Sequence, residues 1–252
     1  LVNGMSIKHT VDLTEDFGRL VGYLIGDGTW SQGKSVSIFF NGSEKRFVDD
    51  SVYLLKKYFG VDAEWYIHND KNMYIINVNS TLICEFLSKW IGLKDKSKKI
   101  PSEFYYGTKD LKHGLISGLI RSDGCYKDNT VSFTTISRNL AYEYQTVCAS
   151  LSIPVSVQKH KHSTKKGFGW HYDIEGYGNS AADLHSIARK HQDLDGLKDR
   201  SKGRSIQNLN NYIVSTVRRV RTSNYSGQVY NIEVEEDNSY HVNGFCVHNC
   251  TI

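Results

Sequence analysis

The period of the apolar positions changes several times along the chain, and each change predicts a new helix or strand. The first apolar run begins after Asp12 and Thr14, either of which can cap a helix, and ends at Asp27 before Gly28, which can terminate one. Alternating and helical periods then follow one another up to Trp90. They predict strand-like segments around 36–40, a helix over 44–59, a hairpin from 63–67 and 74–78, and a helix over 81–90.

The same order of elements returns after Trp90. The predicted elements are a helix ending at Asp123, a strand over 131–135, a helix over 139–151, strands near 155–160 and 170–175, and a helix over 181–189. The pattern therefore predicts αββαββα written twice. Beyond residue 209 the helical period disappears, and short apolar runs predict an all-β segment with strands near 214–221, 229–234, 240–242 and 245–248.

Two sequence blocks repeat in the same order as the elements. Residues 20–28 (LVGYLIGDG) resemble residues 116–124 (ISGLIRSDG), and residues 92–98 (GLKDKSK) resemble residues 196–202 (GLKDRSK). Ordered similarity at two places indicates two successive units of one kind.

Composition excludes several classes of protein. With 252 residues, 39% of them hydrophobic and 23% charged, the chain has a globular composition, and no apolar run approaches the roughly 20 residues that span a bilayer. We expect an intracellular, cytoplasmic protein without a membrane partner. The five cysteines are scattered, which argues against a disulfide framework or a zinc site. A net charge of +4 permits nucleic-acid binding without requiring it.

Small residues recur four positions apart in both repeated helices, as Gly22 with Gly26 and Gly118 with Ser122. Such faces allow two helices to pack closely, which would bring Asp27 and Asp123 together at two helix C-termini, where the helix dipoles are already negative. Oxygen ligands there suit Mg²⁺, and metal ions suit phosphodiester hydrolysis. The candidate metal ligands are Asp27, Asp123, Gly26 and Ser122. The alternative is that each Asp-Gly pair only terminates its helix.

These blocks resemble the motif of the LAGLIDADG homing endonucleases, in the two-motif single-chain form. The first matches it at the leucine, both glycines and the aspartate; the second at Gly118, Leu119, Ile120, Asp123 and Gly124. The resemblance implies an α+β fold in which pseudo-twofold-related units, 14–110 and 111–209, form a DNA-binding saddle in a monomeric internal pseudo-dimer. It implies site-specific, double-strand cleavage of DNA at a long target site with Mg²⁺ or another divalent cation. Ile25 and Arg121 depart from the acid often found at that position.

The family resemblance also assigns a role to Lys98, which stands two residues before an Ile-Pro pair ahead of the second motif. In the related intein-borne enzymes, such a lysine polarises the scissile phosphate or a water. The internal repeat extends this expectation to Lys202, although Gly-Arg-Ser replaces Lys-Ile-Pro after it. The alternative for both residues is a solvated, lysine-rich loop.

DNA contacts are expected from strands and loops. Basic and aromatic residues are mixed over 157–170, where lysines could neutralise phosphates or reach guanine edges. An exposed β-ribbon also carries lysine to discourage edge pairing, which is the alternative. The candidates are Lys159, Lys161, Lys165 and Lys166, with Trp30, Lys34 and Tyr66 as counterparts in the first unit.

Residues His248, Asn249 and Cys250 stand side by side near the end of the sequence. The side-chain nitrogen of Asn249 can attack its own carbonyl carbon, which forms a succinimide and releases the chain that follows. His248 can polarise that carbonyl or protonate the departing amine, and Cys250 is a strong nucleophile. The three residues together predict a centre that cleaves and joins peptide bonds.

Residues 228–240 and 242–249 resemble the two C-terminal motifs of inteins, with departures at Asn231 and Asn238. The resemblance implies a Hint-type splicing segment over 210–249, followed by 250–252 as the start of the C-extein. Residues 1–13 are then a lead, and we expect the C-terminal piece of a split intein that needs an N-terminal fragment in trans. The alternative is a LAGLIDADG protein that binds DNA or acts as a scaffold without cutting, with only the splicing chemistry active.

Overall fold

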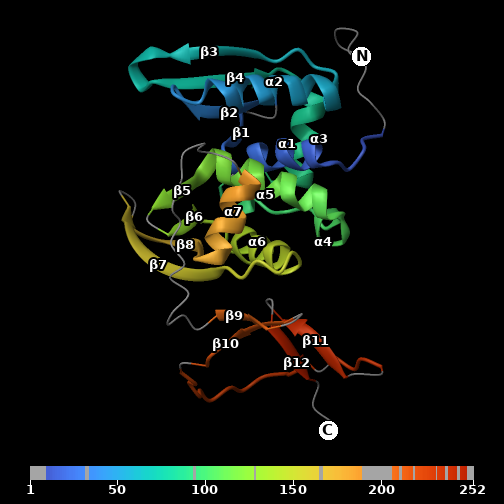
Figure 1. Cartoon of the computed structure of the whole chain (residues 1–252), viewed down its shortest axis with the longest axis vertical. Helices are drawn as coiled ribbons and strands as arrows, with labels where there is room; N and C mark the ends of the chain where they lie inside the picture. The colour runs from blue at the N-terminus through green and yellow to red at the C-terminus, as the bar shows by residue number, and fades with distance from the viewer. Residues whose placement is uncertain are drawn as a thin grey trace.

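The computed structural model describes residues 10–31, 34–92, 95–127, 129–164, 167–188, 206–209, 212–217, 219–230, 232–235, 238–242 and 245–248. Two four-stranded sheets lie on either side of a central pair of helices, and a group of short strands follows them (Figure 1). Within the described ranges, no helix is long and apolar enough to cross a membrane.

The first unit places its strands in the order β1-β2-β4-β3, with all neighbours antiparallel. Side-chain oxygens begin two of its helices: Thr14 accepts the Phe17 N–H, and Ser80 accepts the Ile83 N–H. Its elements are α1 (Glu15–Gly26), β1 (Gly28–Ser31), β2 (Ser35–Asn41), α2 (Lys45–Phe59), β3 (Glu64–His68), the 3-10 helix η1 (Asn69–Lys71), β4 (Met73–Val78) and α3 (Thr81–Trp90).

The second unit repeats this topology, with the strand order β5-β6-β8-β7. Thr108 and Ser137 cap its two longest helices in the same way. After η2 (Asp95–Ser97) and α4 (Glu103–Tyr106), its elements are α5 (Lys109–Asp123), β5 (Gly124–Lys127), β6 (Thr130–Thr135), α6 (Arg138–Ala149), β7 (Ser156–Thr164), β8 (Gly167–Tyr177) and α7 (Asn179–Ala188). The predicted α+β class, with two antiparallel sheets and their helices, is therefore confirmed.

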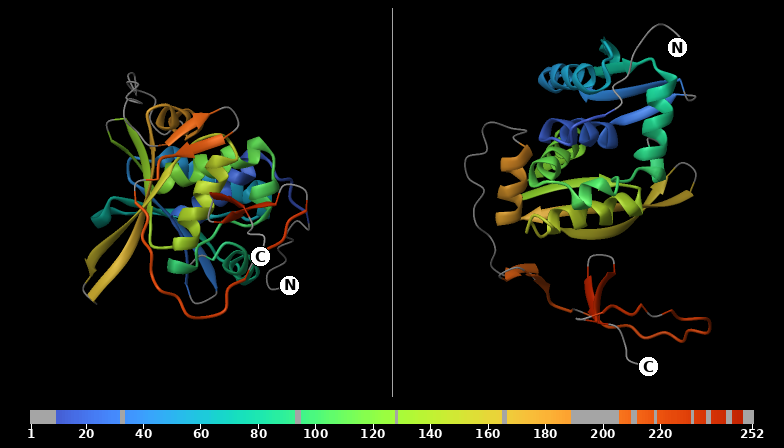
Figure 2. Two further views of the ribbon diagram at one scale, coloured as in Figure 1. Left: turned by 90° about the horizontal axis from the view of Figure 1, so that it is seen from below. Right: turned by 90° about the vertical axis from the view of Figure 1, so that its right-hand side faces the viewer.

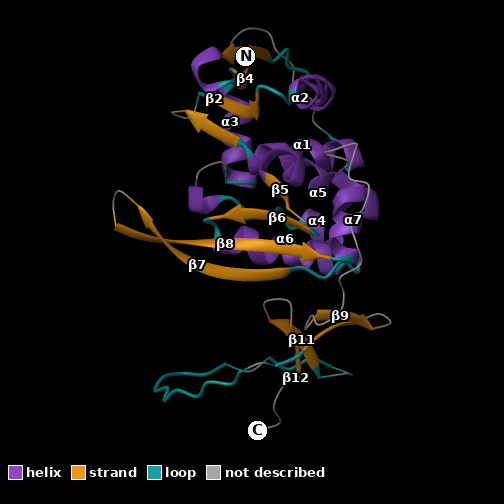
Figure 3. Ribbon diagram, turned by 60° about the vertical axis from the view of Figure 1, so that its left-hand side comes forward, coloured by secondary structure: helices purple, strands orange, loops and turns teal. Residues whose placement is uncertain are grey.

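The core explains which face of each sheet the helices cover. In β2 the burial alternates, so that Val36, Ile38 and Phe40 are buried on one face while their neighbours are more exposed. The helices α1 and α5 pack on each other and lie between the two sheets (Figure 1 and the right-hand view of Figure 2). The second unit differs in β7 and β8, which are longer than predicted and project beyond the helices (Figure 3).

The C-terminal segment departs from the prediction. The strand pairs are β9 (Ile206–Leu209) with β10 (Tyr212–Ser215), and β11 (Ser239–Val242) with β12 (Phe245–His248). The predicted strand over 214–221 survives only in its first two residues, which lie in β10, and the strand over 229–234 is wrong, because the described residues between Ser215 and β11 form no strand. Apolar residues there remain exposed, so an apolar run alone did not make a strand. The β9–β10 hairpin also crosses the predicted boundary between 209 and 210.

Candidate functional site

The two central helices run parallel and touch through their backbones. A Cβ atom built on Gly22 would lie 2.5 Å from the Leu115 carbonyl oxygen and 2.7 Å from Cα of Gly118. A Cβ on Gly26 would collide with the Ser122 side chain, one turn further along both helices. Only residues without side chains permit this approach. Since the contacts advance together, both helices end at the same place.

Asp27 and Asp123 lie at these two ends. Asp27 follows α1 and caps it through a backbone N–H bond to Tyr23, and Asp123 is the last residue of α5. Together with Lys98 they line an open pocket of about 390 Å³. The remaining lining comes from both units, namely Ile25, Gly26, Gly28, Thr29, Thr134, Thr135, Ile136 and Leu140.

Lys98 reaches this pocket from the loop between the two units. Its Nζ donates to the carbonyl oxygen of Gly26, at the C-terminus of α1. Ser122, beside Gly26, donates its hydroxyl hydrogen to the carbonyl oxygens of Gly118 at 2.9 Å and Leu119 at 3.1 Å. A lysine cation at a helix C-terminus is favourable because the helix dipole is negative there. The site therefore combines two acids with a cation.

The donor chemistry of the site favours a hard cation. The described part of the chain holds no group of three or more His, Cys, Asp or Glu side chains arranged for a metal. What the pocket offers is two carboxylates, with the carbonyl and hydroxyl oxygens of Gly26 and Ser122 close by. Such an oxygen-only set with room for water fits Mg²⁺ and does not fit zinc, which takes sulfur and imidazole ligands.

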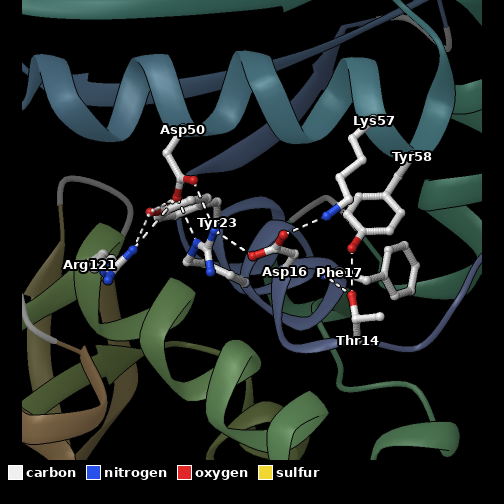
Figure 4. Close-up of polar contacts among 9 residues, drawn as sticks. Thr14, Asp16, Phe17, Tyr23, Asp50, Lys57, Tyr58 and Arg121 are labelled. Atoms are coloured by element: carbon white, nitrogen blue, oxygen red, sulfur yellow. Dashed lines mark hydrogen bonds and ion pairs between the residues drawn. The ribbon is translucent and has the colours of Figure 1, made fainter.

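A charged cluster that the sequence did not predict joins α1, α2 and α5 (Figure 4). Asp50 accepts from Arg19 at 2.7 and 3.0 Å and from the Tyr23 hydroxyl at 2.9 Å. Arg121 approaches the same carboxylate at 3.6 Å and donates to the Ala188 carbonyl at 2.6 Å. Burial, with the Asp50 charge, raises the pKa of Tyr23. Arg121 of α5 thus binds both α2 and α7. This structural role explains why an arginine stands at the motif position where related sequences often have an acid.

The same cluster continues to the start of α1. Asp16 pairs with Arg19 at 2.9 Å and with Lys57 of α2 at 2.6 Å. Burial alone would raise the pKa of Asp16, but the hydrogen bond from Lys57 and the charge of Arg19 outweigh it, so the pKa lies below its ordinary value. These contacts tie α1 to α2 from Asp16 to Tyr23.

Trp30, one of the expected DNA contacts in the first unit, faces the wrong way for that role. In the β1–β2 pair it lies opposite Val36, which is buried, and its ring packs against the hydrophobic core. Lys34 and Tyr66 are exposed, and Tyr66 lies opposite Ile75 on the face of the sheet away from Val36. The expectation for Trp30 is therefore corrected, because a strand alternates its side chains between two faces.

Lys159 and Lys161 lie on the helix-covered side of the second sheet. Lys159 is opposite Tyr172, which is buried and packs its ring against Tyr142 of α6. The ammonium groups of the two lysines stand 4.1 Å from the ring centres of Trp170 and Phe168, respectively.

The opposite face of the same hairpin carries a polar set that the sequence did not single out. His160 and His171 stack with their ring centres 5.5 Å apart, and Asp173 lies 3.6 and 3.5 Å from their Nε2 atoms. Asp173 also accepts from Thr134 at 2.6 Å. Thr134 lines the pocket of Asp27 and Asp123, so this face continues into the site. Alternation along a strand predicts which residues share a face of the sheet, but it does not predict which of the two faces lies toward the site.

The C-terminal residues are only partly described. His248 is exposed at the end of β12, opposite Ser239 of β11. Other candidates fall outside the described residues, namely Lys165, Lys166, Lys202, Asn249 and Cys250.

Comparison with known proteins gives matches over nearly the whole chain. The ATP-dependent DNA helicase Hel308 of Thermococcus kodakarensis is 29% identical over 97% of this chain, which covers 22% of the helicase. A DNA polymerase of Thermococcus litoralis is 22% identical over 95% of this chain, which covers 15% of the polymerase. The chain therefore spans less than a quarter of either protein.

Solved structures give the fold independently. The homing endonuclease I-DmoI in complex with DNA and Mn superposes on 71% of this chain and 99% of its own, with a TM-score of 0.52 at 14% identity. Mesophilic variants of I-DmoI superpose on 72% of this chain with a TM-score of 0.51. A sequence model of the LAGLIDADG-like domain matches residues 14–90 and 110–188, one range in each unit. The chain therefore belongs to the LAGLIDADG-like domain family, and its fold is that of the homing endonuclease I-DmoI.

Proposed function

We propose that the protein is a site-specific DNA endonuclease that makes a double-strand break with the help of Mg²⁺ or another divalent cation. One observation carries the proposal: Asp27, Asp123 and Lys98 line a single open pocket where the two parallel helices end. Carboxylates at two helix C-termini repel each other unless a cation joins them, and a divalent cation meets that need. A phosphodiester is the substrate that such a site suits.

Each residue of the pocket has a defined task in this proposal. Asp27 and Asp123 would hold the cation, with the oxygens of Gly26 and Ser122 as further candidates. The bound cation would neutralise charge on the phosphate and activate a water. Lys98 would leave the Gly26 carbonyl and donate to the scissile phosphate or to the water. Each acid would act on one strand of the DNA, so this single pocket would account for cleavage of both DNA strands.

The DNA would lie against the faces of the sheets that continue into this pocket. In the second unit that face presents His160, His171 and Asp173 rather than Lys159 and Lys161. In the first unit it presents Tyr66. Such side chains can hydrogen-bond with base edges in a groove, whereas the lysines would act on phosphates or on the solubility of the hairpin.

A cleavage assay on a library of double-stranded DNA tests the proposal. The wild-type chain is expected to cut one long site with Mg²⁺ and not with chelator. Asp27→Asn and Asp123→Asn should each lower the rate by at least about 100-fold, the loss typical of a group that stabilises transition-state charge. Asp62→Asn is the matched control, because Asp62 is an exposed acid paired with Lys56. Sequence-selective binding without cutting would instead favour the non-cutting DNA-binding protein.

We also propose that the C-terminal segment carries protein-splicing residues. A helicase and a polymerase have different activities, yet each contains a region similar to nearly all of this chain. A mobile segment inserted into unrelated host proteins accounts for that distribution. The β11–β12 hairpin places His248 at its end, directly before Asn249 and Cys250. The amide nitrogen of Asn249 would attack its own carbonyl carbon and break the bond to Cys250, while His248 would protonate the departing amine.

Mass spectrometry of a chain extended beyond Cys250 tests the splicing residues. The expected result is slow release of the extension, with a succinimide left at Asn249, and no release from Asn249→Ala. His248→Ala should slow the release, and Gln228→Ala is a control in the same segment. Release that persists in Asn249→Ala would contradict this chemistry.

A further inference from the structure

The loop that carries Lys98 is held by two side chains of the second unit, that of Ser137, which caps α6, and that of Glu143 within α6. Ser137 donates its hydroxyl hydrogen to the Lys98 carbonyl oxygen at 2.7 Å. The same hydroxyl oxygen accepts the Leu140 N–H at 3.2 Å, and Ser137 is fully buried, so its rotamer is fixed by the start of the helix. Glu143 accepts the Ile100 N–H at 2.7 Å. The two bonds fix the backbone at residues 98 and 100.

Glu143 stands in a setting that suits this task. Its side chain is partly buried, and burial raises its pKa, while the Ile100 N–H and the charge of Lys99 act in the opposite direction. The described part of the chain shows no salt bridge to this carboxylate. A carboxylate withdrawn from water needs hydrogen-bond donors in place of the water it loses, and here a backbone N–H of the loop supplies one.

The other end of the loop shows why its position matters. Lys99 donates its backbone N–H to Ile91 at 3.0 Å, and the Ile100 side chain is buried. The backbone is therefore anchored at the Lys98 carbonyl and at the two residues that follow it, while the Lys98 side chain reaches the Gly26 carbonyl. A shift of the loop by about 1 Å would move the ammonium group away from the pocket, and misplacements of that size can cost about 100-fold in rate.

We propose that Glu143 is a positioning residue, which holds the 98–100 backbone so that Lys98 points into the pocket of Asp27 and Asp123. The inference rests on the proposed endonuclease function for its effect on cleavage. The position of Lys98, which contacts α1 of the first unit, then depends on a helix of the second unit. The two halves of the pocket are thereby coupled through the protein as well as through the helix pair.

A double-mutant cycle tests this role, with single-turnover cleavage rates and DNA dissociation constants measured for each variant. Glu143→Leu should cut at least about tenfold more slowly at an unchanged dissociation constant. Glu143→Gln keeps an acceptor for the Ile100 N–H and should cut within about threefold of the wild type. In a Lys98→Met background, Glu143→Leu should cause no further loss. A full additional loss there, or wild-type cleavage by Glu143→Leu, would overturn the proposal.

Hydrogen exchange of the Ile100 amide separates this inference from the endonuclease function. Exchange should be faster in Glu143→Leu than in the wild type and unchanged in Glu143→Gln, with unchanged exchange at amides of the α1–α5 helix pair reporting intact folding of each variant. A wild-type chain that cuts no DNA overturns the endonuclease function and, with it, the effect of Glu143 on cleavage. Unchanged exchange in Glu143→Leu overturns the backbone anchor itself.

Discussion

Asp50 on α2 and Glu143 on α6 occupy equivalent places on equivalent helices, yet they hold different parts of the molecule. The burial around them is the same, with Phe47, Val48 and Ser51 buried in α2 and Leu140, Ala141 and Tyr144 buried in α6. Asp50 accepts from Arg19 and Tyr23 of the central helix. Glu143 accepts from the loop that carries Lys98.

The cause of the difference lies on the central helices. Aligning Gly22 with Gly118 places Leu115 at the position of Arg19 and Leu119 at the position of Tyr23. Both leucines are fully buried, so α5 offers no donor to the acid on α6. The apolar pattern constrains the two units equally because each must fill the same core. Half-buried polar positions are free to diverge, and in this chain one serves stability while the other serves the site.

The largest expected effect comes from breaking what the two units share. A Cβ at Gly118 would lie 2.8 Å from Cα of Gly22 and would also collide with the Arg19 carbonyl. Gly118→Val should therefore lower the free energy of unfolding by about 3 kcal/mol, the upper end of the usual cost of overpacking, because the neighbouring backbone cannot yield. Denaturant unfolding measures the loss, and Ala149→Gln on the exposed side of α6 is the control. A loss below about 1 kcal/mol would show that the helices can separate without cost.

A smaller effect is expected where the first unit differs. Asp50→Asn removes the anion that pairs with Arg19 and Arg121, and should cost about 2 kcal/mol, between the values for exposed and buried pairs. The neighbouring Asp49→Asn should cost less than about 0.5 kcal/mol, because Asp49 pairs with Lys45 on the exposed surface. Equal losses in the two variants would mean that the Asp50 cluster adds nothing beyond an ordinary surface pair.

The smallest effect concerns Glu143 and its dependence on pH. Burial raises the pKa of Glu143, so the folded chain holds this proton more tightly than the unfolded chain does. The wild type should therefore lose stability relative to Glu143→Gln as the pH rises from about 4.5 through the raised pKa, and the difference should vanish at lower pH. Thermal melts of both proteins across this range measure it. A constant difference in melting temperature would mean that Glu143 keeps an ordinary pKa when folded.

Local sequence features predicted the shared parts of the fold well. Small residues four apart and the Asp-Gly pairs indicated two helices that meet, and the structure brings Asp27, Asp123 and Lys98 into one pocket. The apolar period predicted most helices and strands of both units. These features are local, because each depends on residues within one or two turns of a helix.

The parts that were not predicted depend on contacts between distant segments. Asp50 is 31 residues from Arg19, and Glu143 is 43 residues from Ile100. The face of Lys159 is decided by its register with Tyr172, which the sequence of one strand does not contain. Apolar residues such as Val229 and Tyr230 predicted a strand, but their side chains are exposed, so apolar residues in this segment do not indicate a strand paired in a sheet.

The glycine contacts between α1 and α5 also determine how far apart the C-terminal ends of the two helices lie. Backbone touches backbone at Gly22 and Gly118, and next to the acids only the small Ser122 side chain stands against Gly26, so the separation of the two helix ends that carry Asp27 and Asp123 is set by contacts of very small residues. In the proposed endonuclease, substitutions on the exposed faces of the strands would change the side chains that can contact DNA. They would leave the spacing of the two acids unchanged, because the contacts at Gly22, Gly26 and Gly118 are made by residues of the two helices alone.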